Sequence, residues 1–297
     1  GGIGPMAKHR LDDEHARLRV AKTTLIDATQ NGGGARFERR KRAAEEGLYR
    51  PTFEKDACGV GFIANMKGEN SHRIVADGLQ IGENLTHRGA VGADPLMGDG
   101  AGMLVQKPDA FFREEMAALG ITLPDTEDYA VGFIFMPQDD DLRARCEAVV
   151  EEVVAAEGQT ILGWRDVPVD NSCLSQAPDI KASEPVHRQV FITRGPTTAA
   201  GDDFERRLFI LRKGISNRIY AGIASGEEFY IVSLSSRTIV YKGMFLAYQL
   251  GAYFADLKDE RFTSSLALVH QRFSTNTFPS WKLAHPYRMV AHNGEIN

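Results

Sequence analysis

The stretch Asp56-Ala57-Cys58-Gly59-Val60-Gly61-Phe62 contains the residue on which the interpretation of this chain depends. A cysteine is a strong nucleophile only as a thiolate, and no His or Asp lies beside Cys58 to take its proton. If the chain were cut after Ala57, the new α-amino group of Cys58 would supply that base, because an α-amine titrates near ~8 and a thiol near ~8.5. A lone cysteine before an apolar strand is also typical of a buried core residue, so this stretch alone leaves both interpretations open.

A segment near the other end of the chain carries groups that suit a small polar substrate. The apolar run from Leu266 to Val269 leads into His270-Gln271-Arg272-Phe273-Ser274-Thr275-Asn276-Thr277-Phe278-Pro279-Ser280-Trp281. Apolar residues followed by an arginine, hydroxyls, an amide and a proline indicate a strand that opens into a binding loop. The planar guanidinium of Arg272 matches the geometry of a carboxylate.

The last segment, from Met289 to Asn297, is expected to be a short strand that ends in Asn293-Gly294. The side-chain amide of Asn293 and the backbone N–H of Gly294 can both donate to one developing oxyanion, and glycine lets the backbone come close. Asn-Gly is also the commonest dipeptide of tight hairpin turns, which leaves a purely structural interpretation open.

Six motifs that follow one another along the chain connect these stretches. They are Cys58-Gly59-Val60-Gly61-Phe62, His87-Arg88-Gly89-Ala90, Gly98-Asp99-Gly100-Ala101-Gly102, Ser235-Ser236-Arg237-Thr238-Ile239-Val240-Tyr241-Lys242-Gly243-Met244, Gln271-Arg272-Phe273-Ser274-Thr275-Asn276 and His292-Asn293-Gly294-Glu295-Ile296-Asn297. With them the chain resembles, from about Tyr49 to Asn297, the amino-terminal glutaminase domain of glutamate synthase large subunits, a class II glutamine amidotransferase of the N-terminal-nucleophile hydrolase type. The resemblance implies an α+β fold, the αββα sandwich of two antiparallel sheets flanked by helices.

The same resemblance implies three catalytic groups. Cys58 matches the nucleophile and new N-terminus, and Asn293 with Gly294 matches the oxyanion hole. In the implied reaction the Cys58 thiolate attacks the side-chain amide of L-glutamine, ammonia leaves, and water hydrolyses the γ-glutamyl thioester to glutamate.

Substrate-binding residues are implied in the same way. Arg272 matches the arginine that binds the α-carboxylate of glutamine, and Thr275 and His285 match weaker contacts at that end of the substrate. The family also uses an acidic residue after the Asn-Gly pair to hold the α-amino group. The chain stops at Asn297, before such a position, so the site as given is incomplete.

Composition is compatible with the fold and the function that the resemblance implies. A chain of 297 residues that is 43% hydrophobic and 25% charged suits one large soluble domain or two small ones. The net charge of −5 argues against nucleic-acid binding. The lack of an apolar run of ~18 residues and of a signal peptide makes a cytoplasmic location, with no membrane association, the default expectation. We expect residues 1–57 to be a loosely ordered leader that is removed as a propeptide, and residues 58–297 to form the glutaminase domain, incomplete at its C-terminus.

The resemblance implies no cofactor within this chain, and the three cysteines give no metal-binding pattern. Full-length family members use FMN and an iron–sulfur cluster in downstream synthase domains of the same polypeptide. There the ammonia converts 2-oxoglutarate to a second glutamate, with electrons supplied through a small reductase subunit or ferredoxin.

Two alternative functions stay open at this point. One is another class II amidotransferase, which would transfer ammonia to a sugar phosphate, PRPP or aspartate. The other is a non-catalytic amidotransferase-like domain that binds a partner. The long leader and the run Ser235 to Met244 favour glutamate synthase, and the joint presence of the cysteine, the arginine and the Asn-Gly pair argues against a non-catalytic domain.

Apolar periodicity predicts the elements that carry these residues. Strands are expected at 59–65, 101–106, 130–136, 161–169, 185–193, 228–234 and 237–242, the last two as a hairpin-like pair, and helices at 74–85, 108–119, 140–156 and 202–221. Cys146 falls on the apolar stripe of the third helix and Cys173 in a polar loop. Gly98 to Gly102 is interpreted as a flexible loop near the site, not a dinucleotide fingerprint. Strands paired in sequence order fit two stacked sheets, although periodicity alone does not separate α+β from α/β.

Overall fold

The computed structural model describes residues 59–86, 89, 94–273 and 279–290. Backbone contacts divide the chain into two units, residues 1–55 and residues 56–297. Every described residue belongs to the unit of residues 56–297. The expected leader, residues 1–57, lies outside the described residues.

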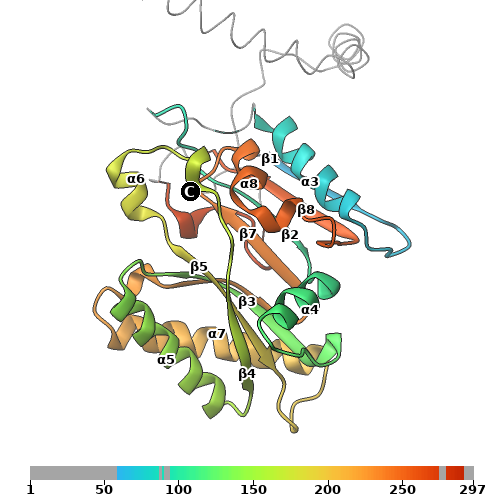
Figure 1. Cartoon of the computed structure of the whole chain (residues 1–297), viewed down its shortest axis with the longest axis vertical. Helices are drawn as coiled ribbons and strands as arrows, with labels where there is room; N and C mark the ends of the chain where they lie inside the picture. Colours follow the sequence, from blue (N-terminus) through green and yellow to red (C-terminus); the bar gives the residue numbers. More distant parts are fainter. Residues whose placement is uncertain (1–58, 87–88, 90–93, 274–278, 291–297) are drawn as a thin grey trace, which may run out of the picture. The chain divides into compact units, whose positions relative to one another are not determined.

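In this described part, eight strands form two four-stranded antiparallel sheets (Figure 1). The first sheet has the strand order β1-β8-β2-β7, with the bounds β1 Gly59–Ala64, β8 Leu266–Gln271, β2 Ala101–Gln106 and β7 Thr238–Gly243. The second sheet has the order β4-β5-β3-β6, with the bounds β4 Thr160–Asp166, β5 Val186–Thr193, β3 Tyr129–Met136 and β6 Tyr230–Ser235.

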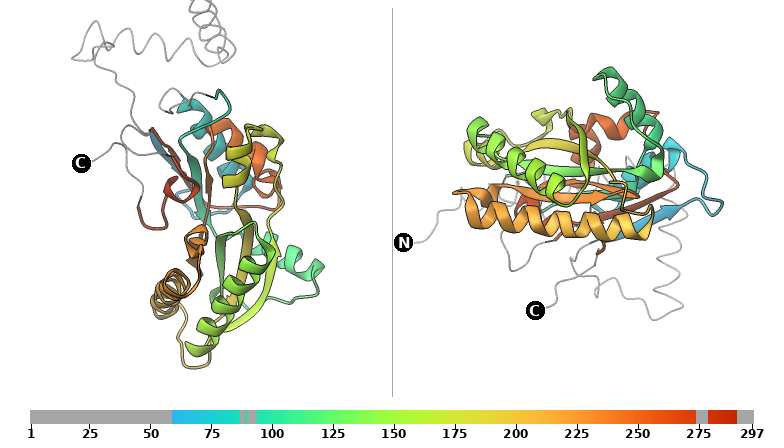
Figure 2. Two further views of the ribbon diagram at one scale, coloured as in Figure 1. Left: turned by 90° about the vertical axis from the view of Figure 1, so that its left-hand side faces the viewer. Right: turned by 90° about the horizontal axis from the view of Figure 1, so that it is seen from below.

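Helices cover both sheets. The α-helices are α3 His72–Asn84, α4 Asp109–Ala118, α5 Asp140–Ala156, α6 Pro178–Ser183, α7 Asp202–Gly222 and α8 Ala247–Tyr253. Short 3-10 helices lie at Thr126–Asp128, Asn171–Cys173, Gly226–Glu228, Ala255–Lys258 and Trp281–Leu283. α3 and α8 pack on the first sheet, whereas α5 and α7 pack on the second and against each other (Figure 2). Two antiparallel sheets with flanking helices confirm the expected α+β class. Among the described residues, no helix is long and apolar enough to span a membrane.

Helix boundaries and faces follow from local sequence. The Asp139 carboxylate accepts a hydrogen bond of 2.7 Å from the backbone N–H of Leu142, which caps α5. Cys146 is fully buried on the apolar stripe of α5, as predicted. In α7 the buried residues recur every three to four positions: Phe204, Leu208, Leu211, Ile215 and Ile219. These two helices therefore bury their apolar faces in one cluster with a face of the second sheet.

A larger apolar cluster joins the two sheets. The face of β3 that carries Val131, Phe133 and Phe135 points away from α5 and α7 and into this cluster. Its partners include β7, since the rings of Phe133 and Tyr241 lie 4.9 Å apart in an edge-to-face arrangement. The larger of the two apolar clusters therefore contains residues from both sheets.

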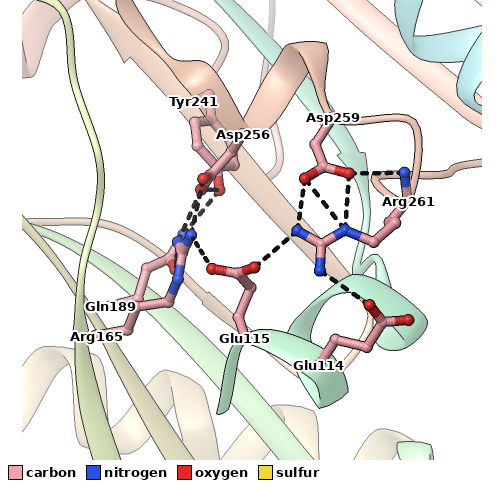
Figure 3. Close-up of polar contacts among 8 residues, drawn as sticks. All are labelled: Glu114, Glu115, Arg165, Gln189, Tyr241, Asp256, Asp259 and Arg261. Carbon is pink, nitrogen blue, oxygen red and sulfur yellow. Dashed lines mark hydrogen bonds and ion pairs between the residues drawn. The ribbon is translucent and has the colours of Figure 1, made fainter. Parts of the chain in front are cut away.

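A buried polar network adds a second link between the sheets (Figure 3). Arg165 of β4 donates to both carboxylate oxygens of Asp256, at 2.8 Å each, and to the Gln189 side chain of β5 at 2.9 Å. The Tyr241 hydroxyl of β7 donates to the same Asp256 carboxylate at 2.7 Å, and Glu115 of α4 accepts from Arg165 at 2.9 Å. Elements from both sheets thus converge on one buried carboxylate.

The strand pairing differs from the expectation in two ways. β6 and β7 do not form a hairpin, because β6 lies in the second sheet and β7 in the first. At the crossing, the backbone N–H of Val240 donates to the Ser233 hydroxyl at 3.1 Å, so a side chain takes the place of a ladder hydrogen bond. The strands also do not pair in sequence order, since β1 pairs with β8, near the other end of the described chain.

Candidate functional site

The start of β1 and the end of β8 meet in the first sheet. Gly59, the residue after Cys58, pairs with Gln271, the residue before Arg272. Ala101, the first residue of β2, pairs with Gln271 from the other side. The backbone N–H of Arg272 then donates to the Gly100 carbonyl at 2.8 Å. Two stretches that the sequence analysis selected independently are therefore adjacent in space.

Of the six predicted site residues, Arg272 and His285 lie among the described residues. The His285 imidazole stacks on that of His270, with ring centroids 4.6 Å apart, and contacts the Tyr287 ring at 4.3 Å. His270 and Arg272 are two positions apart at the strand end, so both belong to the same side of the sheet. The structure thus brings His285 to the side of β8 on which Arg272 lies.

The other four predicted residues, Cys58, Thr275, Asn293 and Gly294, lie outside the described residues, and their roles stay predictions. Met289 and Val290, which we expected to begin the last strand, lie in a bend and an irregular stretch.

The glycines of the Gly98 to Gly102 motif have a packing role. A Cβ on Gly102 would lie 2.5 Å from the His285 carbonyl oxygen, and a Cβ on Gly100 would lie 2.9 Å from the Ala284 Cβ. Gly100 also has φ of 142°, a value that other residues rarely adopt. The motif lies beside the predicted site, as expected, but it is closely packed where we had expected a flexible loop. Its small residues let the segment with His285 lie against β2.

Lys242 of β7 is a buried cation in this region that the sequence analysis did not single out. Its Nζ donates to the carbonyls of Lys282 and Ala284, at 2.9 and 2.7 Å. It also lies 4.3 Å from the centre of the Tyr287 ring. Burial holds the pKa of Lys242 well below its usual value, and the neighbouring charges of Arg212 and Arg272 lower it further. The charge of Arg272 favours an anionic group, such as a carboxylate, at this end of β8.

Glu205 of α7 is a second, largely buried charge that the sequence pattern did not reveal. One carboxylate oxygen accepts from the Ser235 hydroxyl at 2.9 Å and from the backbone N–H and hydroxyl of Ser236 at 2.6 and 2.7 Å. The other oxygen forms an ion pair with Arg288. Burial alone would raise the pKa of Glu205, but the hydrogen bonds from Ser236 and Ser235 and the Arg288 charge lower it below its usual value. Helical spacing marks Glu205 only as a polar position on α7, because its partners come from distant segments.

Gln271 has an unusual environment. Its side chain is 1% exposed, and within the described part of the chain neither its Oε1 nor its Nε2 has a hydrogen-bond partner. A Cβ on Gly89 would lie 2.4 Å from that Nε2, so a larger residue there would have to displace the Gln271 side chain. Gly89 belongs to the His87-Arg88-Gly89-Ala90 motif, and this contact places it beside the end of β8, where Gln271 pairs with Gly59.

The two cysteines that the structure describes are poor nucleophiles. Burial raises the pKa of the Cys146 thiol to about 11. Burial also raises the pKa of the Cys173 thiol, and the nearby Asp170 charge adds to the effect. Because the thiolate is the reactive species, neither residue competes with Cys58 as a candidate.

Comparisons with known proteins extend these observations. The family model described as "Glutamine amidotransferases class-II" matches residues 58–297. The chain is 49% identical to the "Glutamate synthase [NADPH] large chain" of Bacillus subtilis over 85% of this chain and 16% of the relative. It is 44% identical to the "Glutamate synthase [NADH]" of Schizosaccharomyces pombe over 85% of this chain and 12% of the relative. It is 43% identical to the "Ferredoxin-dependent glutamate synthase 2" of a Synechocystis strain over 82% of this chain and 15% of the relative. The matched part of the chain thus spans less than a fifth of each of these relatives.

Proposed function

The chain belongs to the class-II glutamine amidotransferases, and from this premise we propose that residues 58–297 form the glutaminase domain of a glutamate synthase, with residues 1–57 as a leader that is removed. The observation that carries the proposal is the pairing of Gly59 with Gln271, which brings the residue after Cys58 next to the residue before Arg272. Similarity to glutamate synthases from three organisms supports the choice among amidotransferases.

In this proposal the substrate is L-glutamine. Its α-carboxylate binds the Arg272 guanidinium, whose fork of donors suits two carboxylate oxygens. His285 and Thr275 contact the same end of the substrate.

Cys58 carries the chemistry once it is the first residue of the chain. Its α-amino group takes the thiol proton, and the thiolate attacks the side-chain amide carbon of glutamine. The side-chain amide of Asn293 and the N–H of Gly294 stabilise the tetrahedral oxyanion, and loss of one such donor typically costs about 100-fold or more in rate. The ammonium group returns its proton to the leaving nitrogen, the C–N bond breaks and ammonia departs. Water then hydrolyses the γ-glutamyl thioester, which releases glutamate and the free thiol.

The ammonia is used in a second reaction, which lies outside these residues. We propose that it passes to an FMN-containing synthase domain, where 2-oxoglutarate is reductively aminated, with an iron–sulfur cluster on the electron path. The names of the relatives carry NADPH, NADH and ferredoxin, so they leave the electron donor open. We also propose a cytoplasmic location for this enzyme.

A glutaminase assay tests the proposal. Ammonia release from glutamine is measured with the complete polypeptide that carries these residues, in wild-type form and with Cys58→Ala. Cys173→Ala is the matched control, because that thiol is half-buried and has a raised pKa. We expect Cys58→Ala to abolish ammonia release and Cys173→Ala to retain it. Wild-type protein without glutaminase activity, or an active Cys58→Ala variant, would contradict the proposed function.

A further inference from the structure

One segment connects the described part of the site to the predicted oxyanion hole. Residues 280–290, called here the return segment, contain His285 and lead directly to Asn293 and Gly294. The segment has little regular structure, with a single 3-10 turn at Trp281–Leu283. The position of the segment therefore depends on contacts with other elements. A buried lysine and a largely buried glutamate make such contacts on either side of His285.

We propose that Lys242 and Glu205 are positioning residues for the glutaminase reaction, which fix the return segment before and after His285. This inference rests on the proposed function. Lys242 lies in the motif from Ser235 to Met244, but the resemblance assigned it no role, and Glu205 lies in none of the six motifs. Neither of them contacts the substrate in the mechanism above. Both act through the segment that carries substrate-binding and oxyanion groups.

Lys242 fixes the part before His285. It is fully buried, and its two carbonyl acceptors, Lys282 and Ala284, both belong to the return segment. Ala284 is the neighbour of His285, so this contact sets the backbone from which the His285 ring stacks on His270. Gly102 makes the arrangement possible, because a side chain there would collide with the His285 carbonyl.

Glu205 fixes the part after His285. Three donors from Ser235 and Ser236 hold one of its oxygens, and the other oxygen pairs with Arg288. The Glu205 and Arg288 side chains are only 11% and 13% exposed, so water screens this pair less than a surface ion pair. Asn293 is five residues further along, within about 18 Å of chain from Arg288 even when fully extended. Release of Arg288 would therefore let the oxyanion donors move.

Charged anchors suit this role better than apolar ones. An apolar contact tolerates sliding, whereas a buried charge loses much of its stabilisation when its partner moves away. Lys242 and Glu205 thus fix the position of the return segment, which has little regular backbone hydrogen bonding of its own. Their contribution is to geometry, and a loss of stability alone would not reveal it.

The chain contains a matched control for Lys242. Lys107 is also buried, and its Nζ also donates to two backbone carbonyls, those of Thr126 and Tyr129, at 2.5 and 2.8 Å. It likewise lies over a tyrosine ring, at 3.5 Å from the centre of Tyr129. None of these contacts involves the return segment. Lys107→Met therefore reproduces the loss of a buried, doubly bonded lysine without removing a contact to the return segment, although the Lys107 charge also interacts with that of Glu205.

The first test compares Lys242→Met with Lys107→Met in the complete polypeptide. The glutaminase KM and kcat are normalised to the fraction that begins at Cys58, which intact mass measures, so that a defect in leader removal does not count as a catalytic one. We expect similar losses of thermal stability for both variants. We expect a KM increase of about tenfold or more for Lys242→Met alone. Equal KM and kcat for the two variants would overturn the role of Lys242.

The second test examines Glu205, and it also decides the proposal if Lys242→Met does not fold. Glu205→Gln keeps an acceptor for Ser235 and Ser236 but removes the charge that faces Arg288. We expect kcat to fall about tenfold or more, with a smaller change in KM, because the oxyanion donors follow Arg288. Arg288→Lys, which keeps the charge, should retain more of the wild-type kcat than Arg288→Met.

The outcomes separate the two proposals. An inactive wild-type protein, or an active Cys58→Ala variant, would refute the proposed function itself. An active wild-type protein whose kcat and KM are unchanged by Glu205→Gln and Arg288→Met would refute the positioning role and leave the glutaminase assignment intact.

Discussion

The imidazole of His285 lies over that of His270, with ring centroids 4.6 Å apart and planes inclined by 28°. His285 is 7% exposed and His270 is 1% exposed. This stack attaches the return segment to β8 two residues before Arg272. Through this contact His285 lies on the side of the sheet where the substrate carboxylate is proposed to bind.

His285 can be tested by separating its stacking from its polar function. His285→Phe keeps an aromatic ring over His270 but has no ring nitrogen, whereas His285→Ala loses both. If His285 contacts glutamine, both changes should raise KM by roughly 2- to 12-fold, the effect of one lost hydrogen bond. His285→Ala should be the less stable of the two by thermal unfolding. A wild-type KM for His285→Phe would remove the imidazole from the substrate site and leave it a packing role.

Arg272 should respond to its geometry as well as to its charge. Arg272→Ala and Arg272→Lys are each expected to lower kcat/KM by about 10- to 150-fold, mainly through KM, because a charged hydrogen bond is lost. Lysine is a poor replacement because it lacks the planar pair of donors. Steady-state kinetics over a wide range of glutamine concentrations measures the effect. An unaltered KM in Arg272→Ala would exclude this residue as the carboxylate ligand.

The buried network of Figure 3 gives a test of the fold. Asp256 is 2% exposed and carries the paired Arg165, so Asp256→Ala should destabilise the protein by about 3–5 kcal/mol. Asp259 serves as the control, because its partner Arg261 is 40% exposed. Asp259→Ala should cost no more than about 1 kcal/mol. Urea unfolding followed by circular dichroism would show the difference, and equal losses would mean that the buried network contributes little.

His187 predicts how stability depends on pH. Burial lowers the pKa of His187 to about 3, with its Nε2 at 2.8 Å from the Tyr253 hydroxyl. In the unfolded chain His187 has the ordinary histidine pKa of about 6.5. Between about pH 6.5 and 3 it is therefore protonated in the unfolded chain and neutral in the folded one. This group therefore contributes full stability above about pH 6.5, and the contribution is lost as the pH falls towards 3.

The expected slope is at most about 1.4 kcal/mol per pH unit from this one residue. His187→Gln cannot take up the proton and should unfold with a weaker pH dependence in that window. Urea titrations at several pH values between 4 and 7 compare the two proteins, and parallel curves would show that His187 is not the group responsible.

Much of the fold followed from local pattern. The helix α7 was predicted almost to its ends, because buried apolar residues at helical spacing leave little choice, and Asp139 marked the start of α5. β2 has the predicted bounds. The sheet partners did not follow, because periodicity records which face of a strand is buried and not which strand lies next to it. The passage from β6 to β7 therefore resembled a hairpin in sequence and proved to be a crossing between sheets.

The candidate site, like the fold, could be predicted only in part from the sequence. Arg272 was found because an arginine at the end of an apolar strand is a local signal. His285 was found through family resemblance, and the structure supplies its stacking partner. The roles of Lys242 and Glu205 were not predicted, because they depend on partners 30 or more residues away in the chain. The spacing of the glycines from Gly98 to Gly102 was visible, but its cause, the close approach of the return segment, required the fold.

The proposed reaction requires Cys58 to be a free N-terminal nucleophile. Peptide mapping tests this requirement directly. The complete polypeptide is treated with a glutamine-mimicking diazo-ketone, digested and analysed by mass spectrometry. The account predicts a covalently labelled peptide that begins at Cys58, which would establish the cleavage, the nucleophile and the substrate class together. An unlabelled peptide that runs uncut through Ala57 and Cys58 would contradict it.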